Sequence, residues 1–170
     1  MPYEINLGDR TALVTGAARG IGRAISLELS NAGASIVVND LSAQDCEGTV
    51  EEIKSKGGKA ISFGADVSDK AQVEGMIAKA VEVFGSLDIL VNNAGTVVRK
   101  SAIELSEEEW DKTIDVNLKG AFLCSQSAIR RMIESKRKGC NIINISSVLG
   151  DVALPPRSAY SASKGGMISL

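Results

Sequence analysis

Residues 10–22 read RTALVTGAARGIG, a short apolar run followed at once by a glycine-rich turn. Ala12 to Val14 are too few for a helix and suit a strand covered on both faces of a parallel sheet. Gly16 allows a tight turn, and Gly20 and Gly22 let the backbone and the start of a helix approach a diphosphate without a Cβ in the way. The spacing departs from the G-x-G-x-x-G fingerprint, so taken alone the turn is equally well explained as a plain strand-to-helix connection.

Four more strand-like runs follow, and helical patterns separate them. The runs lie at residues 35–39, 59–64, 87–91 and 141–146, and the helical patterns at 21–32, 45–56, 68–84, from 106 onward and from 160 onward. This alternation predicts the α/β class: a Rossmann-type doubly wound parallel sheet with strand order 3-2-1-4-5. The length predicts a single domain spanning residues 1–170.

Polar residues stand where three of these strands end, at the edge where open α/β sheets bind ligands. Asp40 comes 20 residues after Gly20, where a carboxylate can accept both hydroxyls of a ribose, although a helix cap is the alternative. Asp66 and Val67 follow the third strand. The run Asn92–Gly95 follows the fourth strand, and its amides either bind a ligand or form a turn.

Charge and composition exclude several classes of partner. The formal net charge is −2, and binding to nucleic acid or to an anionic membrane needs clustered cations, so we expect neither partner. One basic cluster exists, and its place at the end of a long helix predicts a solvated helix end. It consists of Arg130, Arg131, Lys136, Arg137 and Lys138.

The absence of certain residue types limits the catalytic and metal-binding chemistry that the chain can carry out. The chain contains no histidine, which excludes serine–histidine triads and most catalytic zinc sites. Cys46, Cys124 and Cys140 have neither disulfide nor zinc-ligand spacing, so we expect reduced thiols, no metal site and a cytoplasmic protein. The first ten residues lack an apolar core, so no signal peptide is expected. Proton transfer must therefore use Tyr, Lys, Asp, Glu or Cys.

Two further positions lie on helices. Tyr160 and Lys164 are four residues apart and share one helix face, although most such pairs are merely exposed. Ser106 to Glu109 forms a capping box that opens a long helix. In the interior of this long helix, Asn117 and Gly120 are poor helix formers, so either the helix tolerates them or it is locally opened.

The order of these features resembles the classical short-chain dehydrogenase/reductase family over the whole chain. The matching positions are TGAARGIG at 15–22, Asp66-Val67, NNAG at 92–95, Asn117, Ser147, Tyr160 and Lys164. The contexts VNNAG and NISSV are similar to those of 3-oxoacyl-carrier-protein reductases and of gluconate or sugar dehydrogenases. A catalytically silent nucleotide-binding or scaffold protein is the alternative, but such a protein would usually lose Ser147, Tyr160 or Lys164.

The resemblance implies hydride transfer between a nicotinamide cofactor and a secondary alcohol or ketone. It implies that Tyr160 exchanges a proton with the substrate oxygen, that Lys164 holds the phenolate and the nicotinamide ribose, and that Ser147 hydrogen-bonds the substrate oxygen. A neighbouring ammonium stabilises a phenolate by a few kcal/mol, about the amount that such a role requires at neutral pH. Asn117 would hold a water in a proton relay to Lys164.

The resemblance also implies a set of cofactor-binding positions. They are Gly16, Arg19, Gly20, Ile21, Gly22, Asp40, Asp66, Val67, Asn93, Ala94, Gly95, Tyr160 and Lys164. Asp40 lies where the 2′-phosphate of NADP would go, so we expect a preference for NAD. The basic residue Arg19, just before Gly20, resembles one NADP-binding pattern of the family, so NADP is the alternative cofactor.

The resemblance implies a homo-oligomer, often a tetramer, and a longer chain. Family members continue through a sixth and a seventh strand and a substrate lid, whereas this chain stops at Leu170. We therefore expect the sequence to be truncated before its sixth strand. A polypeptide ending at Leu170 should leave the strand at 141–146 as an exposed edge and should not be an active monomer. The identity of the substrate would depend mostly on the missing segments.

Overall fold

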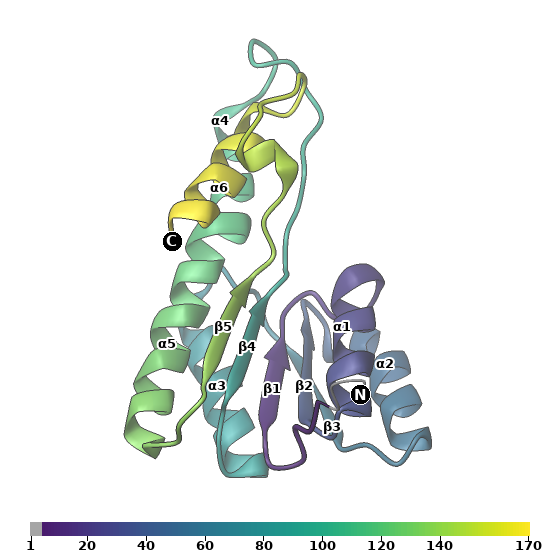
Figure 1. The fold of residues 1–170 in the computed structure, drawn as a ribbon. Coiled ribbons are helices and arrows are strands. Elements are labelled where there is room, and N and C mark those ends of the chain that lie inside the picture. The colour runs from purple at the N-terminus through teal and green to yellow at the C-terminus, as the bar shows by residue number, and fades with distance from the viewer. Residues whose placement is uncertain (1–4) are drawn as a thin grey trace.

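The sheet has the predicted order. The structure, a computed structural model, describes residues 5–170, and these form a five-stranded parallel sheet in the order β3-β2-β1-β4-β5 (Figure 1). Leu13 of β1 lies in register with Val37 of β2 and Leu90 of β4. The strands are β1 (Thr11–Val14), β2 (Ser35–Asp40), β3 (Ala60–Gly64), β4 (Ile89–Asn92) and β5 (Asn141–Asn144). Both the predicted strand order and the α/β class are confirmed.

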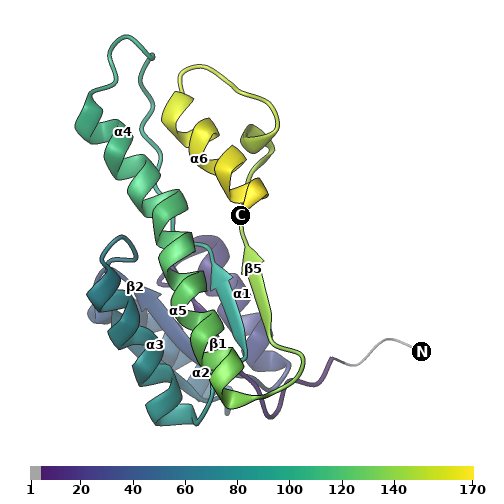
Figure 2. The same cartoon turned by 90° about the vertical axis from the view of Figure 1, so that its left-hand side faces the viewer.

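Helices cover both faces of this sheet (Figure 2). Leu13 packs in a core cluster with α3 and α5, whereas its neighbours Ala12 and Val14 pack in a second cluster with α1 and α2. The two clusters lie on opposite faces because successive side chains of a strand point to opposite sides of the sheet. Among residues 5–170, no helix has the length and hydropathy needed to cross a bilayer. The helices are α1 (Gly20–Asn31), α2 (Ala43–Ser55), α3 (Lys70–Phe84), α4 (Glu107–Ile114), α5 (Gly120–Ser135) and α6 (Ser158–Ser169).

The predicted helix ends are partly right. The capping box of Ser106 and Glu109 is present, and Gly85 ends α3 in the left-handed conformation with φ of 83°. The helix expected at residues 68–84 begins at Lys70, and Asp69 caps it, because the Asp69 carboxylate accepts two amides of the first turn. Two helices begin two residues earlier than expected: α2 starts after its cap Ser42, and α6 starts at Ser158.

The long helix is locally opened, as one of the two alternatives predicted. Between α4 and α5 lies a π-helical turn, η1 (Asp115–Lys119), which contains Asn117. Gly120 follows this turn, and a Cβ there would lie 2.7 Å from a methyl group of Val67. The glycine therefore allows close packing against the segment that leaves β3. The combined helix continues past the sheet, and α6 lies beside its upper part (Figure 2).

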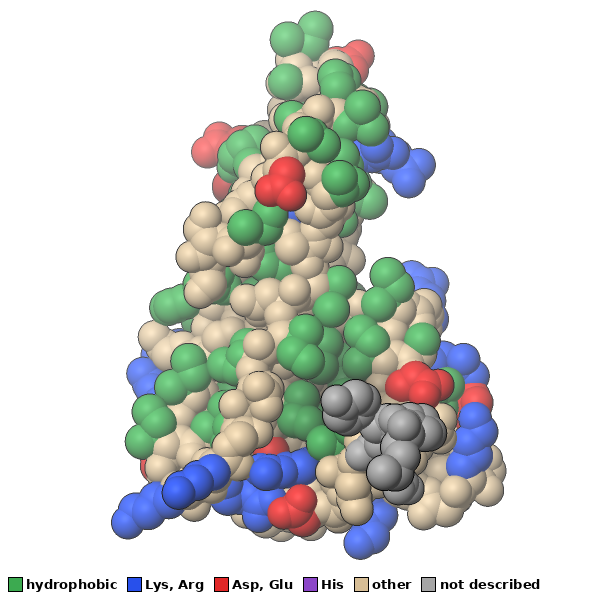
Figure 3. Space-filling view, in the orientation of Figure 1, with side chains coloured by type: hydrophobic (Ala, Val, Ile, Leu, Met, Phe, Trp, Pro, Cys, Tyr) green, Lys and Arg blue, Asp and Glu red, His purple; other side chains and the backbone are tan. Residues whose placement is uncertain are grey.

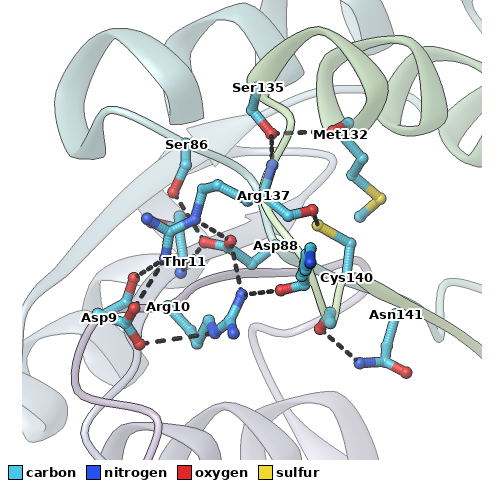
Figure 4. A network of polar contacts seen from close by, with 12 residues as sticks. Asp9, Arg10, Thr11, Ser86, Asp88, Met132, Ser135, Arg137, Cys140 and Asn141 are labelled. Carbon is cyan, nitrogen blue, oxygen red and sulfur yellow. Dashed lines mark hydrogen bonds and ion pairs between the residues drawn. The ribbon is translucent and has the colours of Figure 1, made fainter.

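The opposite end of the sheet is held by a buried carboxylate (Figure 4). Asp88, fully buried just before β4, accepts hydrogen bonds from the Thr11 amide at 2.9 Å and the Ser86 hydroxyl at 2.7 Å. Arg10 and Arg137 also pair with it. The prediction that Arg137 belongs to a solvated helix end is therefore wrong, because the chain turns after α5 and carries this side chain back to the start of β4.

Candidate active site

A cleft of about 360 Å³ opens at the carboxyl ends of β1, β2, β3 and β4. This volume is within the usual range for small-molecule sites. Eight of the expected cofactor residues line it: Gly16, Arg19, Asp40, Asp66, Val67, Asn93, Ala94 and Gly95. Six further residues that sequence reasoning missed also line it: Asn39, Leu41, Ala65, Thr96, Lys112 and Val116. Thus the structure brings together residues up to 100 positions apart, in the place where the strand pattern predicted a ligand.

The three glycines of the turn have different roles. Gly16 has φ of 62°, and a Cβ there would lie 2.9 Å from Cα of Ala94. Gly20 has φ of 60° with open space where its Cβ would be, so it serves the backbone conformation. A Cβ at Gly22 would lie 2.4 Å from the carbonyl oxygen of Gly16. This glycine therefore lets α1 pack against the turn, and its expected place beside a diphosphate stays a prediction.

The neighbours of these glycines differ in exposure. Ile21 is largely exposed, and neither it nor Gly20 or Gly22 is among the residues that line the cleft within 5–170. Arg19 precedes α1 as its N-cap residue with an exposed side chain that makes no capping hydrogen bond. Among residues 19–22, Arg19 is therefore the one that lines the cleft.

Thr15 and Asn93 join the turn to the end of β4. The Thr15 hydroxyl donates to the Val91 carbonyl and accepts from the amides of Asn93 and Ala94, both at 3.0 Å. The Asn93 side chain donates to the carbonyls of Thr15 and Gly16 at 2.8 and 2.9 Å. Sequence reasoning included Thr15 in the matching stretch at 15–22 but gave it no role of its own. Asn93 therefore lines the cleft and also holds two carbonyls of the turn.

The two aspartates at the cleft are held differently. Asp40, the last residue of β2, accepts the Ala18 amide at 3.2 Å through Oδ2 and the Leu41 amide at 3.0 Å through Oδ1. It therefore has lone pairs left for hydroxyl groups. Asp66 accepts the amide and the hydroxyl of Ser68 through one oxygen, Oδ1, which leaves Oδ2 without a partner among residues 5–170.

Tyr160 and Lys164 lie together on α6. Nζ of Lys164 is 5.8 Å from the centre of the Tyr160 ring and donates to the Ile145 carbonyl at 2.7 Å. Lys164 is only 4% exposed and makes no ion pair within residues 5–170, and burial lowers the pKa of its ammonium. Its charge therefore has few partners besides the tyrosine beside it, which fits a group that stabilises a phenolate.

Ser147 stands at the start of the short helix η2 (Val148–Gly150), which packs against α6. Its hydroxyl oxygen accepts the Leu149 amide at 3.2 Å, so its hydrogen remains available to donate. The preceding Ser146 donates to the Lys164 carbonyl at 2.9 Å. This bond ties the serine segment to the helix that carries Tyr160.

Asn117 connects the cleft to α6. Its side chain accepts the Thr96 amide at 2.7 Å, and it donates to the Thr96 carbonyl at 2.9 Å and to the Ser163 hydroxyl at 3.0 Å. Asn117 is fully buried, and both hydrogens of its amide are thereby used. The side-chain amide therefore has no hydrogen left to donate to a relay water, which could bond only an oxygen of Asn117 or its backbone amide.

The cysteines do not offer an alternative acid-base group. Burial, reinforced by nearby Asp40, raises the pKa of Cys46 to about 11, and burial raises that of Cys124 to about 12. Both thiols are therefore protonated at neutral pH. Cys140 directly precedes β5, at the end of the sheet away from the cleft.

Comparison with known proteins finds relatives over nearly the whole chain. A family model described as short chain dehydrogenase matches residues 10–170. The chain is 46% identical over 162 residues to the 3-oxoacyl-[acyl-carrier-protein] reductase FabG of Staphylococcus aureus, a match that covers 95% of the chain and 65% of that protein. It is 39% identical over 168 residues to the (2S)-[(R)-hydroxy(phenyl)methyl]succinyl-CoA dehydrogenase subunit BbsD of Thauera aromatica, covering 98% and 66%.

A solved structure shows the same fold. The short-chain type dehydrogenase/reductase from Mycobacterium marinum superposes with a TM-score of 0.94 at 33% identity, covering 98% of this chain and 68% of that one. The chain thus spans slightly less than two thirds of the length of the two curated relatives, 65% and 66%. Because the family model matches nearly all of its residues, the chain belongs to the short-chain dehydrogenase family.

Proposed function

We propose that the protein is an oxidoreductase that transfers a hydride between a nicotinamide cofactor and a secondary alcohol or ketone. The observation that carries this proposal is the ammonium of Lys164, which is buried beside the Tyr160 ring and has no ion pair within residues 5–170. Such a pair supplies an acid-base group in a chain that has no histidine. The hydrogen bonds of Asn117 join the helix carrying this pair to Thr96, which lines the cleft.

The residues of the cleft fit a dinucleotide. Gly16 and Gly20 have positive φ values that form the turn, and the first amides of α1 have no partner within the helix, which suits a diphosphate. Asp40 retains acceptor capacity for the hydroxyls of the adenosine ribose. When bound, the nicotinamide would donate or accept the hydride.

The chain's own residues would handle the proton. In reduction, the Tyr160 hydroxyl donates its proton to the substrate oxygen, and in oxidation the phenolate removes it. Lys164 stabilises the phenolate by its charge, and Ser147 donates its free hydroxyl hydrogen to the substrate oxygen. Asn117 holds α6 against the wall of the cleft and places its backbone where a relay water would bind.

We propose NAD as the preferred cofactor, because the carboxylate of Asp40 would repel a 2′-phosphate. Arg19 and Lys112 line the same cleft with exposed cationic side chains, and neither forms an ion pair within the described part of the chain. These cations attract the diphosphate of either cofactor, so the selectivity between NAD and NADP depends on Asp40.

The surface near Tyr160 favours an apolar substrate. Hydrophobic side chains gather over the upper end of the molecule, which α4 and α6 form (Figure 3). Val148 is 71% exposed directly after Ser147, and Val152 and Leu154 are exposed before Tyr160. We propose a ketone or alcohol with an acyl or aryl group, as in the substrates named for the two curated relatives, rather than a sugar acid.

We further propose a cytoplasmic homo-oligomer, a tetramer by family resemblance. Phe122, Ile129 and Ile133 are exposed along α5 at helical spacing, which supports association through this helix. Light scattering of the full-length protein tests this proposal, and a monomer at micromolar concentration would contradict it.

The function is tested in the full-length protein with a 3-oxoacyl thioester and a sugar acid as the two substrates. Turnover is followed by the absorbance of the reduced nicotinamide. Tyr160→Phe should remove nearly all turnover and leave cofactor affinity unchanged, whereas Lys164→Ala should reduce both. Retention of more than about a tenth of wild-type activity by Tyr160→Phe would contradict the proposal, since a positioned acid-base group contributes at least about 100-fold.

A further inference from the structure

Every carbonyl of the glycine turn at residues 15–18 accepts a side-chain hydrogen bond. Asn93 donates to the first two carbonyls at 2.8 and 2.9 Å. The Thr49 hydroxyl, which comes from α2, lies 3.1 and 3.2 Å from the oxygens of Ala17 and Ala18. Its single hydrogen is shared between these two oxygens. Two side chains therefore hold the whole row of carbonyls.

This arrangement fixes where the amides of the turn point. In a trans peptide the carbonyl and the following amide point in opposite directions, and the turn contains no cis peptide. Holding the Ala18 carbonyl toward Thr49 therefore turns the Arg19 amide away from Thr49. Holding the Thr15 carbonyl toward Asn93 does the same for the Gly16 amide.

Among the amides of residues 16–19, those of Gly16 and Arg19 are also the ones left free within the described part of the chain. Ala17 donates its amide to the Asn39 carbonyl at 2.7 Å, and Ala18 donates to Asp40 at 3.2 Å. Within residues 5–170, the amides of Gly16 and Arg19 have no acceptor, and both residues line the cleft. The turn thus offers two free donors at residues that line the cleft, while its partially negative oxygens are bonded to the side chains of Asn93 and Thr49.

We infer that Thr49 is a positioning residue for the diphosphate of the dinucleotide. It is 1% exposed and does not line the cleft, so it acts through the carbonyls of Ala17 and Ala18. Without its hydroxyl the peptide between Ala18 and Arg19, whose amide has no acceptor within residues 5–170, is free to rotate and to turn its oxygen toward the anion, whereas Asp40 still holds the preceding peptide. The binding-competent turn then becomes less populated. Affinity falls in proportion to that population. The inference rests on the proposed function, because it takes a dinucleotide as the ligand.

The test uses the full-length protein and three variants. Thr49→Val removes the hydroxyl at nearly constant volume, and Thr49→Ser retains it. Thr113→Val is the matched control, because the fully buried Thr113 hydroxyl bonds only the Glu109 carbonyl of its own helix, at 2.8 Å. Dissociation constants for NADH and ADP-ribose are measured by calorimetry at constant salt, and melting temperatures are measured alongside.

Thr49→Val should weaken binding of both ligands about tenfold, the size expected for one net hydrogen bond. Thr49→Ser should stay within about threefold of wild type, and Thr113→Val should lower the melting temperature without changing either affinity. If Thr49→Val does not fold, Thr49→Cys takes its place, and its weak donor should give an intermediate loss.

Two results would overturn the inference in distinguishable ways. If wild type binds NADH and Thr49→Val binds it equally well, Thr49 is merely a core residue and the proposed function stands. If wild type binds neither ligand, the proposed function and this inference both fail.

Discussion

Asp88→Asn should be among the most destabilising isosteric substitutions in this chain. The carboxylate is fully buried and accepts hydrogen bonds from a backbone amide, a serine hydroxyl and two arginines. The substitution removes the charge and places an NH₂ group against one of these donors. Breaking a buried pair typically costs about 3–5 kcal/mol. Because Arg10 and Arg137 are partly exposed and can rehydrate, we expect about 3 kcal/mol, or a fall in melting temperature of about 6–12 °C.

The effect should depend on pH with a definite sign. Burial alone would raise the pKa of Asp88, but hydrogen bonds from Thr11, Ser86 and Arg137 and the charge of Arg137 lower it overall. A carboxyl whose pKa is lower in the folded state contributes its full stability above its unfolded pKa of about 3.9 and loses it as the pH falls through the folded value. Asp88→Asn should therefore lower the free energy of unfolding by its full amount at about pH 7 and by a smaller amount at about pH 3.

The assay is urea unfolding of the full-length protein, followed by circular dichroism at the two pH values and at one protein concentration. Asp9→Asn is the control, because the side chain of Asp9 is 76% exposed and pairs with the same two arginines at the surface. It should change the free energy of unfolding by less than about 1 kcal/mol. Two results would refute the reasoning. One is a loss of less than about 1 kcal/mol in the free energy of unfolding of Asp88→Asn, and the other is a loss that is the same at both pH values.

Two further substitutions test the cleft. Gly22→Ala should abolish measurable NADH binding, because the new Cβ would lie 2.4 Å from the Gly16 carbonyl oxygen; its control Gly75→Ala, at an open position inside α3, should instead raise the melting temperature by about 2–4 °C. Asp40→Ala should narrow the difference between the dissociation constants of NAD and NADP measured by calorimetry. An unchanged ratio would show that another residue sets the selectivity.

Much of the fold could be predicted because its signals are local. Short apolar runs, helical periodicity and the capping box each depend on residues within a few positions of one another. The alternation of strands with helices then predicts a parallel sheet and restricts its strand order. Asn117 and Gly120 also marked the π-helical turn, since both are poor helix formers. Errors at helix ends were small, as when α3 begins at Lys70 rather than at residue 68.

The sequence by itself therefore determined the parallel sheet, the edge at which the cleft lies and most of the residues that line it. Only the tertiary structure decided how that cleft is held in shape. Thr49 reaches across 31 and 32 positions to the glycine turn, and Arg137 reaches 49 positions to Asp88. Such contacts leave no local pattern, because a buried threonine or a basic residue after a helix looks the same in sequence whether or not it has a distant partner. They depend on which elements pack together and in what register, and both are set when the whole chain folds.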